Sequence, residues 1–218
     1  DEANRIVWDG AFPRIAARQT PVNFRFALPG GAATLYEPGS EGVLWWTRYE
    51  DRVRGLKAAS LLDRCSAANS CPKIIEAFGS TEFWGLRISP GLIGTDARAD
   101  IPLPDNVRRY YYPSTTHGGG RGGFRIEPAA AAGPRCVLPD NPNPESDQTR
   151  ALTRALVEWV LAGTPPPASR YPTLAAGELV PATRSATGIP DLPALPFNDR
   201  ILNPMIDYDL GATFIAPD

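Results

Sequence analysis

A single histidine, His117, is the residue of this 218-residue chain best suited to acid–base chemistry. An imidazole changes its charge near neutral pH, so it can accept a proton and return it during a reaction. His117 directly follows an apolar and aromatic segment, 107–112, and precedes a glycine-rich stretch, 118–123. If 107–112 is a strand, His117 lies at its carboxyl end, where open α/β sheets bind their ligands. This position favours a catalytic role over that of a solvated or structural histidine.

A histidine that acts as a base needs a carboxylate to fix its tautomer and to stabilise its cation. Glu82 comes just after the apolar segment 72–79, which ends at a glycine and is predicted to be a strand. If the two predicted strands run parallel, Glu82 and His117 lie at the same edge of the sheet. We therefore predict Glu82 as the acid. Three other carboxylates are the alternatives, in falling order: Asp96, Asp100 and, inside the strand, Glu76.

A nucleophile for this pair is missing from the sequence. The sharp turn that presents a catalytic serine has the pattern Gly-x-Ser-x-Gly between a strand and a helix. Ser40 has Pro38 where the first glycine belongs. Ser80 has Phe78 and Glu82 at the two glycine positions. The chain thus carries an acid and a base but not the group that they would activate.

The composition argues against several other kinds of function. Twenty-two basic and 24 acidic residues leave a net charge of −2, which gives no electrostatic reason to expect nucleic acid or an anionic membrane as a partner. No stretch approaches the roughly 18 apolar residues of a membrane span. The glycines of 118–123 lack the phosphate-binding pattern; they would form a flexible loop or let the backbone approach a substrate. The cysteines lack zinc spacing, so we predict no metal and no cofactor.

The three cysteines bear on the cellular compartment. Cys65 and Cys71 are separated by a short loop, and either form a disulfide or remain two buried thiols. We predict the disulfide, and with it a secreted or periplasmic protein. Cys136 is left over and is a candidate for a disulfide to a companion segment.

The elements that position these residues are few. The 24 prolines and 20 glycines predict long ordered loops and few long helices. The apolar pattern and its stop signals predict short strands and helices, followed by proline-rich coil. The expected elements are strands over 5–12, 72–79 and 107–112, a short helix over 55–62, a long helix over 149–162, and coil over 167–204. Three strands and one clear helix fit the later half of an α/β sheet better than a complete domain.

Several segments resemble a group of bacterial α/β-hydrolase-domain proteins. The segments 80–84, 100–110 and 115–118 carry the resemblance, as do 4–13 and 23–26. The most specific stretch is 72–118, and weaker similarity covers most of the chain. The resemblance implies an α/β-hydrolase fold with the chain order serine, acid, histidine, in which Glu82 matches the acid and His117 the base. It also implies that the serine lies before Asp1. On this basis, residues 1–218 are the C-terminal portion of a single α/β-hydrolase domain, with the nucleophile-bearing part outside the chain.

The predicted function is that of a serine hydrolase acting on a small-molecule carboxylic ester, with this chain supplying the acid and the histidine. Its partner is then the N-terminal fragment of the same polypeptide, packed beside the strand at 5–12. The alternative is a non-catalytic binding or interaction module. In that case aromatic residues such as Trp45, Trp46 and Tyr49 would form a surface for carbohydrate or protein.

Overall fold

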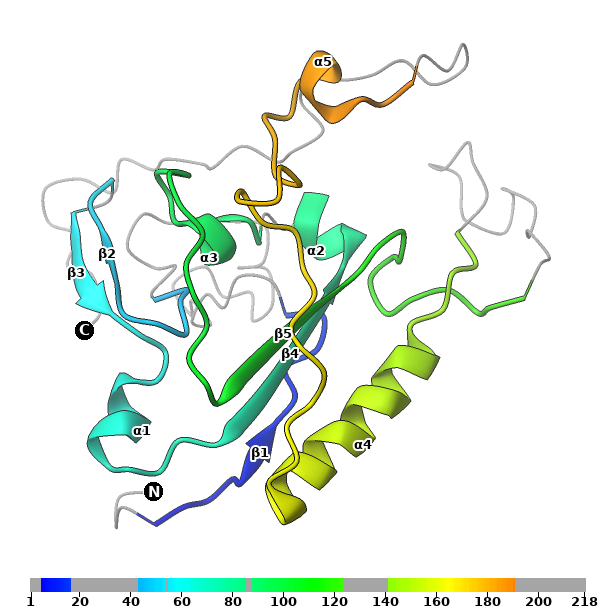
Figure 1. Cartoon of the computed structure of the whole chain (residues 1–218). Helices are drawn as coiled ribbons and strands as arrows, with labels where there is room; N and C mark the ends of the chain where they lie inside the picture. Colours follow the sequence, from blue (N-terminus) through cyan, green and yellow to red (C-terminus); the bar gives the residue numbers. More distant parts are fainter. Residues whose placement is uncertain (1–4, 17–42, 54, 85–87, 124–140, 191–218) are drawn as a thin grey trace, which may run out of the picture. The chain divides into compact units, whose positions relative to one another are not determined.

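The computed structural model describes residues 5–16, 43–53, 55–84, 88–123 and 141–190. The chain divides into two compact units, which are treated separately below (Figure 1). The first unit comprises Asp1–Ala16, Ser70–Phe83 and Asp105–Tyr171, and the second comprises Ala17–Asn69, Trp84–Pro104 and Pro172–Asp218.

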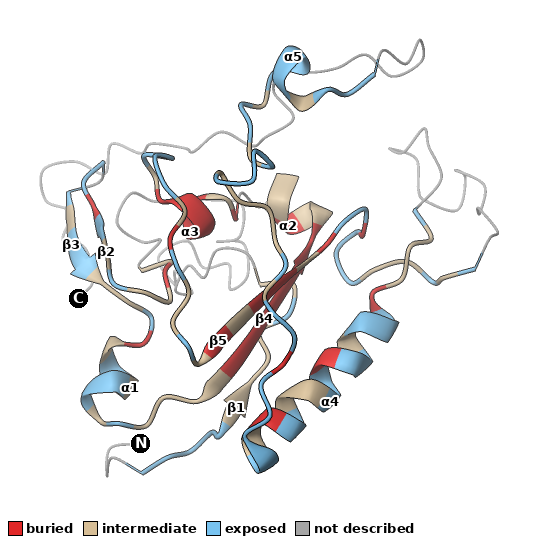
Figure 2. Cartoon of the chain, in the orientation of Figure 1, coloured by how far each residue is buried: buried red, intermediate tan, exposed pale blue. Residues whose placement is uncertain are grey.

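A parallel three-stranded sheet organises the first unit. Its strands are β1 (Gly10–Ala11), β4 (Lys73–Gly79) and β5 (Val107–Tyr112), in the order β1-β4-β5. The strands β4 and β5 pair in continuous register from Ile74 opposite Val107 to Gly79 opposite Tyr112. Figure 2 shows both as largely buried. The apolar run of β4 is the pattern expected of a central parallel strand, which is covered on both faces. These two predicted strands are confirmed.

The predicted strand over 5–12 is wrong in extent. Only Gly10 and Ala11 form a strand, opposite Lys73 and Ile74. Because β4 begins at Lys73, the residues before Asp9 have no neighbouring strand in the described sheet with which to pair. The apolar side chains of this stretch are consequently exposed: Ile6 60%, Val7 52% and Trp8 70%.

Helix α4 (Ser146–Ala162) confirms the predicted long helix and covers one face of the sheet (Figure 1). Its buried residues, Leu152 and Trp159, belong to a core shared with residues of β4 and β5, namely Ile75, Ala77, Tyr110 and Tyr112. The helix ends at Gly163, which has φ +75° and donates its N–H to the Trp159 carbonyl at 3.1 Å. A left-handed glycine is the usual end of a helix, since it has no Cβ to clash.

The second unit contains a β-hairpin and short helices. Strands β2 (Tyr49–Asp51) and β3 (Leu56–Ala59) pair antiparallel. The short helices are α1 (Asp63–Ala67), α3 (Pro90–Ile93) and α5 (Arg184–Thr187), and α2 (Ser80–Trp84) spans the boundary between the units. The predicted helix over 55–62 is wrong. Gly55 (φ +70°) ends the turn after β2, and the backbone that follows then pairs with β2, which overrides its helix propensity.

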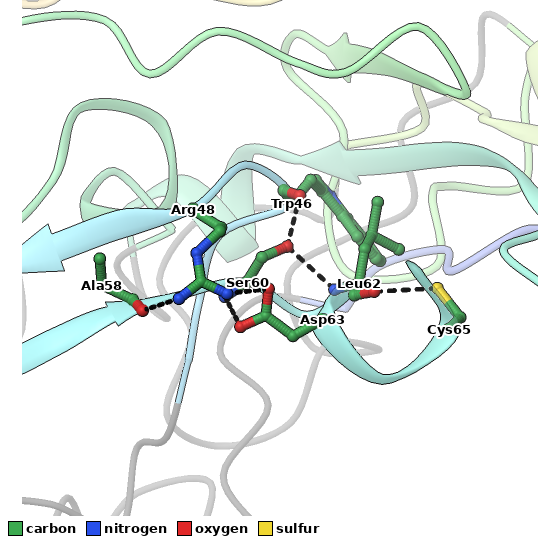
Figure 3. Close-up of polar contacts among 7 residues, drawn as sticks. All are labelled: Trp46, Arg48, Ala58, Ser60, Leu62, Asp63 and Cys65. Atoms are coloured by element: carbon green, nitrogen blue, oxygen red, sulfur yellow. Dashed lines mark hydrogen bonds and ion pairs between the residues drawn. The ribbon is translucent and has the colours of Figure 1, made fainter. Parts of the chain in front are cut away.

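A polar cluster joins the end of this hairpin to α1 (Figure 3). The Asp63 carboxylate accepts the Ser60 N–H at 3.1 Å and pairs with the Arg48 guanidinium at 2.7 Å. The Ser60 hydroxyl donates to the Trp46 carbonyl at 2.6 Å and accepts the Leu62 N–H at 2.9 Å. The Asp63 side chain therefore ties the start of the short helix to the backbone at Ser60, just before it, and to Arg48.

Cys65, in α1, and Cys71 are joined in a disulfide, which confirms the predicted pairing. We expect alkylation of the unreduced, denatured protein to modify two fewer cysteines than alkylation after reduction, as measured by intact mass. Tryptic mapping should yield 65 and 71 on one peptide, 65–73, which is lighter by two hydrogens than the same peptide after reduction. A maleimide that modifies both thiols in native, unreduced protein would contradict the bond. Its closed loop is short, so we expect mainly local ordering from it.

Candidate functional site

The structure brings the predicted acid and base together at one edge of the sheet. Helix α2 begins at Ser80, directly after β4, and places Glu82 in its single turn. The loop that carries His117 begins directly after β5. Because β4 and β5 are parallel, both segments leave the sheet at the same edge. The Nδ1 atom of His117 lies 2.6 Å from Oε1 of Glu82, which is hydrogen-bond distance.

The Glu82 carboxylate is held through both of its oxygens. Its side chain is fully buried, with 0% exposure. While Oε1 contacts His117, Oε2 accepts the Gly79 N–H at 2.7 Å. A Cβ at Gly79 would overlap the Thr115 hydroxyl and would lie 3.3 Å from Oε2. Glycine at this position therefore permits the close packing that fixes the carboxylate.

Hydrogen bonds between the two segments orient the histidine. The backbone N–H of His117 donates to the Thr81 hydroxyl at 3.1 Å, and the Ser80 N–H donates to the Thr115 carbonyl at 2.9 Å. The imidazole itself is 56% exposed. With the carboxylate on Nδ1, the neutral ring carries its proton there and leaves the lone pair of Nε2 to accept another. The pair has the chemistry of a base and its orienting acid.

The alternative acid Glu76 has a structural partner. It lies opposite Arg109 in the β4–β5 register, and its Oε2 is 2.5 Å from Nε of that residue. Both side chains are almost completely buried, at 10% and 2% exposure. The Arg109 guanidinium also lies 5.2 Å from the Tyr171 ring centroid. Removing one member of such a pair leaves a buried charge without compensation, so we expect loss of Glu76 to destabilise the fold.

The other two alternatives, Asp96 and Asp100, also have contacts of their own. Asp96 accepts a hydrogen bond from the Tyr49 hydroxyl at 3.2 Å. Asp100 accepts the backbone N–H groups of Leu174 and Ala175 at 2.7 and 2.9 Å. Within the described ranges, Glu82 is the carboxylate that contacts His117. The catalytic roles of Glu82 and His117 stay a prediction.

The glycine-rich stretch after His117 packs against residues 141–145 of the same chain. This contact was not predicted from the sequence. The N–H groups of Gly120 and Gly122 donate to the carbonyls of Asn143 and Pro142, at 2.7 and 2.8 Å. A Cβ at Gly120 would overlap the backbone of Asn141 and Pro142. The Asn-Pro-Asn-Pro sequence of 141–144 could have indicated this contact. Proline has no backbone N–H, so carbonyls in such a segment accept hydrogen bonds from another segment.

The serines considered as nucleophiles show no catalytic arrangement in the part of the chain that is described. The Ser80 hydroxyl lies 3.0 Å from the Tyr111 hydroxyl. Ser40 lies outside the described residues, as does Cys136. Trp45 is 2% exposed and donates its indole N–H to the Pro90 carbonyl at 2.9 Å. It is a core residue and does not contribute to an aromatic binding surface.

The described residues contain no group of three or more histidine, cysteine or acidic side chains that could hold a metal ion. They also contain no helix with the length and hydropathy of a membrane span.

Comparison with known families identifies the chain. The family model described as alpha/beta hydrolase domain matches residues 1–191. Searches of curated proteins and of solved structures find no significant match. The family match agrees with the parallel β1-β4-β5 sheet and with the resemblance seen in the sequence. The chain therefore belongs to the alpha/beta hydrolase domain family, a family of hydrolases.

Proposed function

We propose that this chain supplies the acid and the base of a Ser-His-Glu triad that hydrolyses a carboxylic ester. The observation that carries the proposal is the 2.6 Å contact between His117 Nδ1 and the fully buried Glu82 carboxylate. Membership of a hydrolase family supports it. The burial of Trp45 weighs against the alternative of an aromatic binding module.

In the proposed reaction a serine hydroxyl attacks the ester carbonyl while Nε2 of His117 takes its proton. The tetrahedral intermediate collapses, the bond to the alcohol breaks, and the imidazolium returns the proton to the departing oxygen. Water then attacks the acyl-serine with the same base, releasing the acid and restoring the serine. Glu82 stabilises the imidazolium in both halves of the reaction, since its buried carboxylate faces Nδ1.

The serine in this proposal belongs to another segment of the same polypeptide, packed beside β1. The support is twofold. No Gly-x-Ser-x-Gly elbow occurs in the 218 residues. Among the described strands β1 pairs with β4 alone, and Ile6, Val7 and Trp8 beside it are exposed. A parallel sheet is normally covered on both faces and extended by neighbouring strands.

A secreted or periplasmic location is part of the same proposal. Its support is the Cys65–Cys71 disulfide, because such bonds form and persist mainly in oxidising compartments. Fractionation of the producing cells tests this location directly.

Labelling with a fluorophosphonate probe tests the proposed function. We expect the probe to modify one serine of the complete protein, and peptide mass mapping to identify that serine. In the His117→Ala variant we expect much less labelling. The physical reason is that a serine hydroxyl is weakly nucleophilic without its base.

Heat-denatured protein and the variant Thr116→Ala serve as controls, since Thr116 is an exposed neighbour of His117. Equal labelling of native and denatured protein, or full labelling of His117→Ala, would contradict the triad. A probe that labels no serine would favour the binding module.

A further inference from the structure

Two asparagine side chains hold the start of the loop that carries His117. The Asn143 amide donates to the carbonyls of Pro113 and Ser114 at 3.0 and 3.3 Å. The Asn141 amide donates to the same Ser114 carbonyl at 2.7 Å. Ser114 has φ +57°, a left-handed conformation that side chains other than glycine rarely adopt. The two amides therefore stabilise the turn that redirects the chain from β5 toward His117.

The same segment also holds the loop after His117. The Asn143 carbonyl accepts the Gly120 N–H at 2.7 Å, so one residue contacts the loop on both sides of the histidine. Gly119, with φ +73°, approaches so closely that a Cβ would lie 2.7 Å from the backbone nitrogen of Glu145. Residues 141–145, called the asparagine clip below, thus enclose the His117 loop from Pro113 to Gly122.

The asparagine clip is anchored on the sheet that also positions Glu82. Its last residue, Glu145, is 3% exposed and pairs with Arg14 at 3.1 Å. Arg14 forms a parallel bridge with Ala77 of β4. The Glu145 carbonyl accepts the Thr149 N–H at 2.9 Å, which starts helix α4. The clip is therefore tied at one end to the strand that leads into Glu82 and to the helix that packs on it.

We propose that Asn143 is a positioning residue for His117, acting through the loop backbone to keep the imidazole on Glu82. This inference rests on the proposed function. The Nδ1–Oε1 contact of 2.6 Å joins two segments that leave different strands, so its length depends on where the His117 loop runs. The asparagine clip contacts that loop before and after the histidine and reaches neither ring nitrogen. Misplacement of a catalytic group by about 1 Å can lower a rate about 100-fold.

The test is Asn143→Asp in the complete protein. The aspartate keeps the shape of the side chain but has no donor, so its carboxylate faces two carbonyl oxygens. We expect kcat for an activated ester to fall about 10- to 100-fold with KM little changed. In ¹⁵N-histidine-labelled protein, we expect the ring nitrogen signals of His117 to lose the fixed Nδ1–H tautomer. These signals are identified by their absence in His117→Gln.

Asn106→Asp is the matched control. The Asn106 amide also donates to one backbone carbonyl, that of Pro72, at 2.9 Å. That bond joins the residues just before β4 and β5, at the opposite end of the same strands from His117. The control makes the same chemical change and is expected to alter neither kcat nor the ring signals.

The inference would be overturned if Asn143→Asp kept the wild-type kcat and ring signals. It would also be overturned if Asn106→Asp lowered kcat and altered the ring signals as Asn143→Asp is expected to do. If Asn143→Asp fails to fold, the exposed Asn141→Asp replaces it, with a smaller expected change in the same two readouts; unchanged readouts there overturn the inference too. The proposed function is tested separately, because it would be contradicted by a His117→Ala variant that keeps its activity. An inactive His117→Ala beside an unaffected Asn143→Asp refutes the positioning role alone.

Discussion

Replacing His117 with alanine is expected to lower ester hydrolysis by the complete protein about 1,000-fold or more while leaving it folded. The imidazole is 56% exposed, so its removal takes little from the core. What is lost is the group that takes the serine proton and returns it to the leaving alcohol. The measurement is kcat/KM on an activated ester, together with a thermal melting curve.

The exposed neighbour Thr116 offers a control in the same loop. Thr116→Ala is expected to keep both the activity and the melting temperature, because the loop contact made by this residue uses its backbone carbonyl, which accepts the Gly119 N–H at 2.9 Å. Full activity of His117→Ala with a normal melting curve would refute the assignment of the base.

The variant Glu82→Gln is expected to retain the fold and to lower kcat by between about 100- and 10,000-fold. A glutamine fits the same space, and its carbonyl can still accept the Gly79 N–H that now reaches Oε2. The amide is neutral, however, and cannot stabilise an imidazolium. It would also present its NH₂ group to Nδ1, which favours the wrong tautomer of the ring. Steady-state kinetics and the ring nitrogen signals of His117 measure the two effects separately.

Asp96→Asn is the comparison for this variant. It makes the same acid-to-amide change at the alternative carboxylate, whose contacts are the Tyr49 hydroxyl at 3.2 Å and the backbone N–H and guanidinium of Arg98. We expect it to be close to wild type in kcat. The reverse result, with a silent Glu82→Gln and a damaging Asp96→Asn, would move the acid to Asp96.

Much of the site could be predicted because its determinants are local in the sequence. The apolar runs that became β4 and β5 are long enough to be unambiguous, and Gly79 and Pro113 mark their ends. Parallel strands place their carboxyl ends at one edge, so the residues that follow each strand meet there. The contact between Glu82 and His117 follows from those two facts. The short spacing from Cys65 to Cys71 likewise favoured a local disulfide, with two free thiols as the alternative.

Predictions failed where a segment's structure depends on a distant neighbour. Leu56–Ala59 has the composition of a helix but pairs with Tyr49–Asp51 as a hairpin. Residues 5–8 have the composition of a strand, yet β4 begins too late in the register to pair with them. In both cases the available hydrogen-bond partner, not the propensity of the segment, selected the conformation.

From the sequence we predicted β4, β5, helix α4, the disulfide and the meeting of Glu82 with His117, and the structure contains each of these features. The way the His117 loop is held could not be predicted, because it depends on residues far along the chain. The carbonyls of Pro113 and Ser114 find their donors at Asn143 and Asn141, nearly thirty residues further along the chain. The tertiary structure likewise paired Glu76 with Arg109 across neighbouring strands. Glu76 and Arg109 are removed from water and need a partner, whereas the exposed carbonyls of Pro113 and Ser114 accept from the amides that the fold places beside them. In both cases the fold, not the local sequence, determines which partner is near.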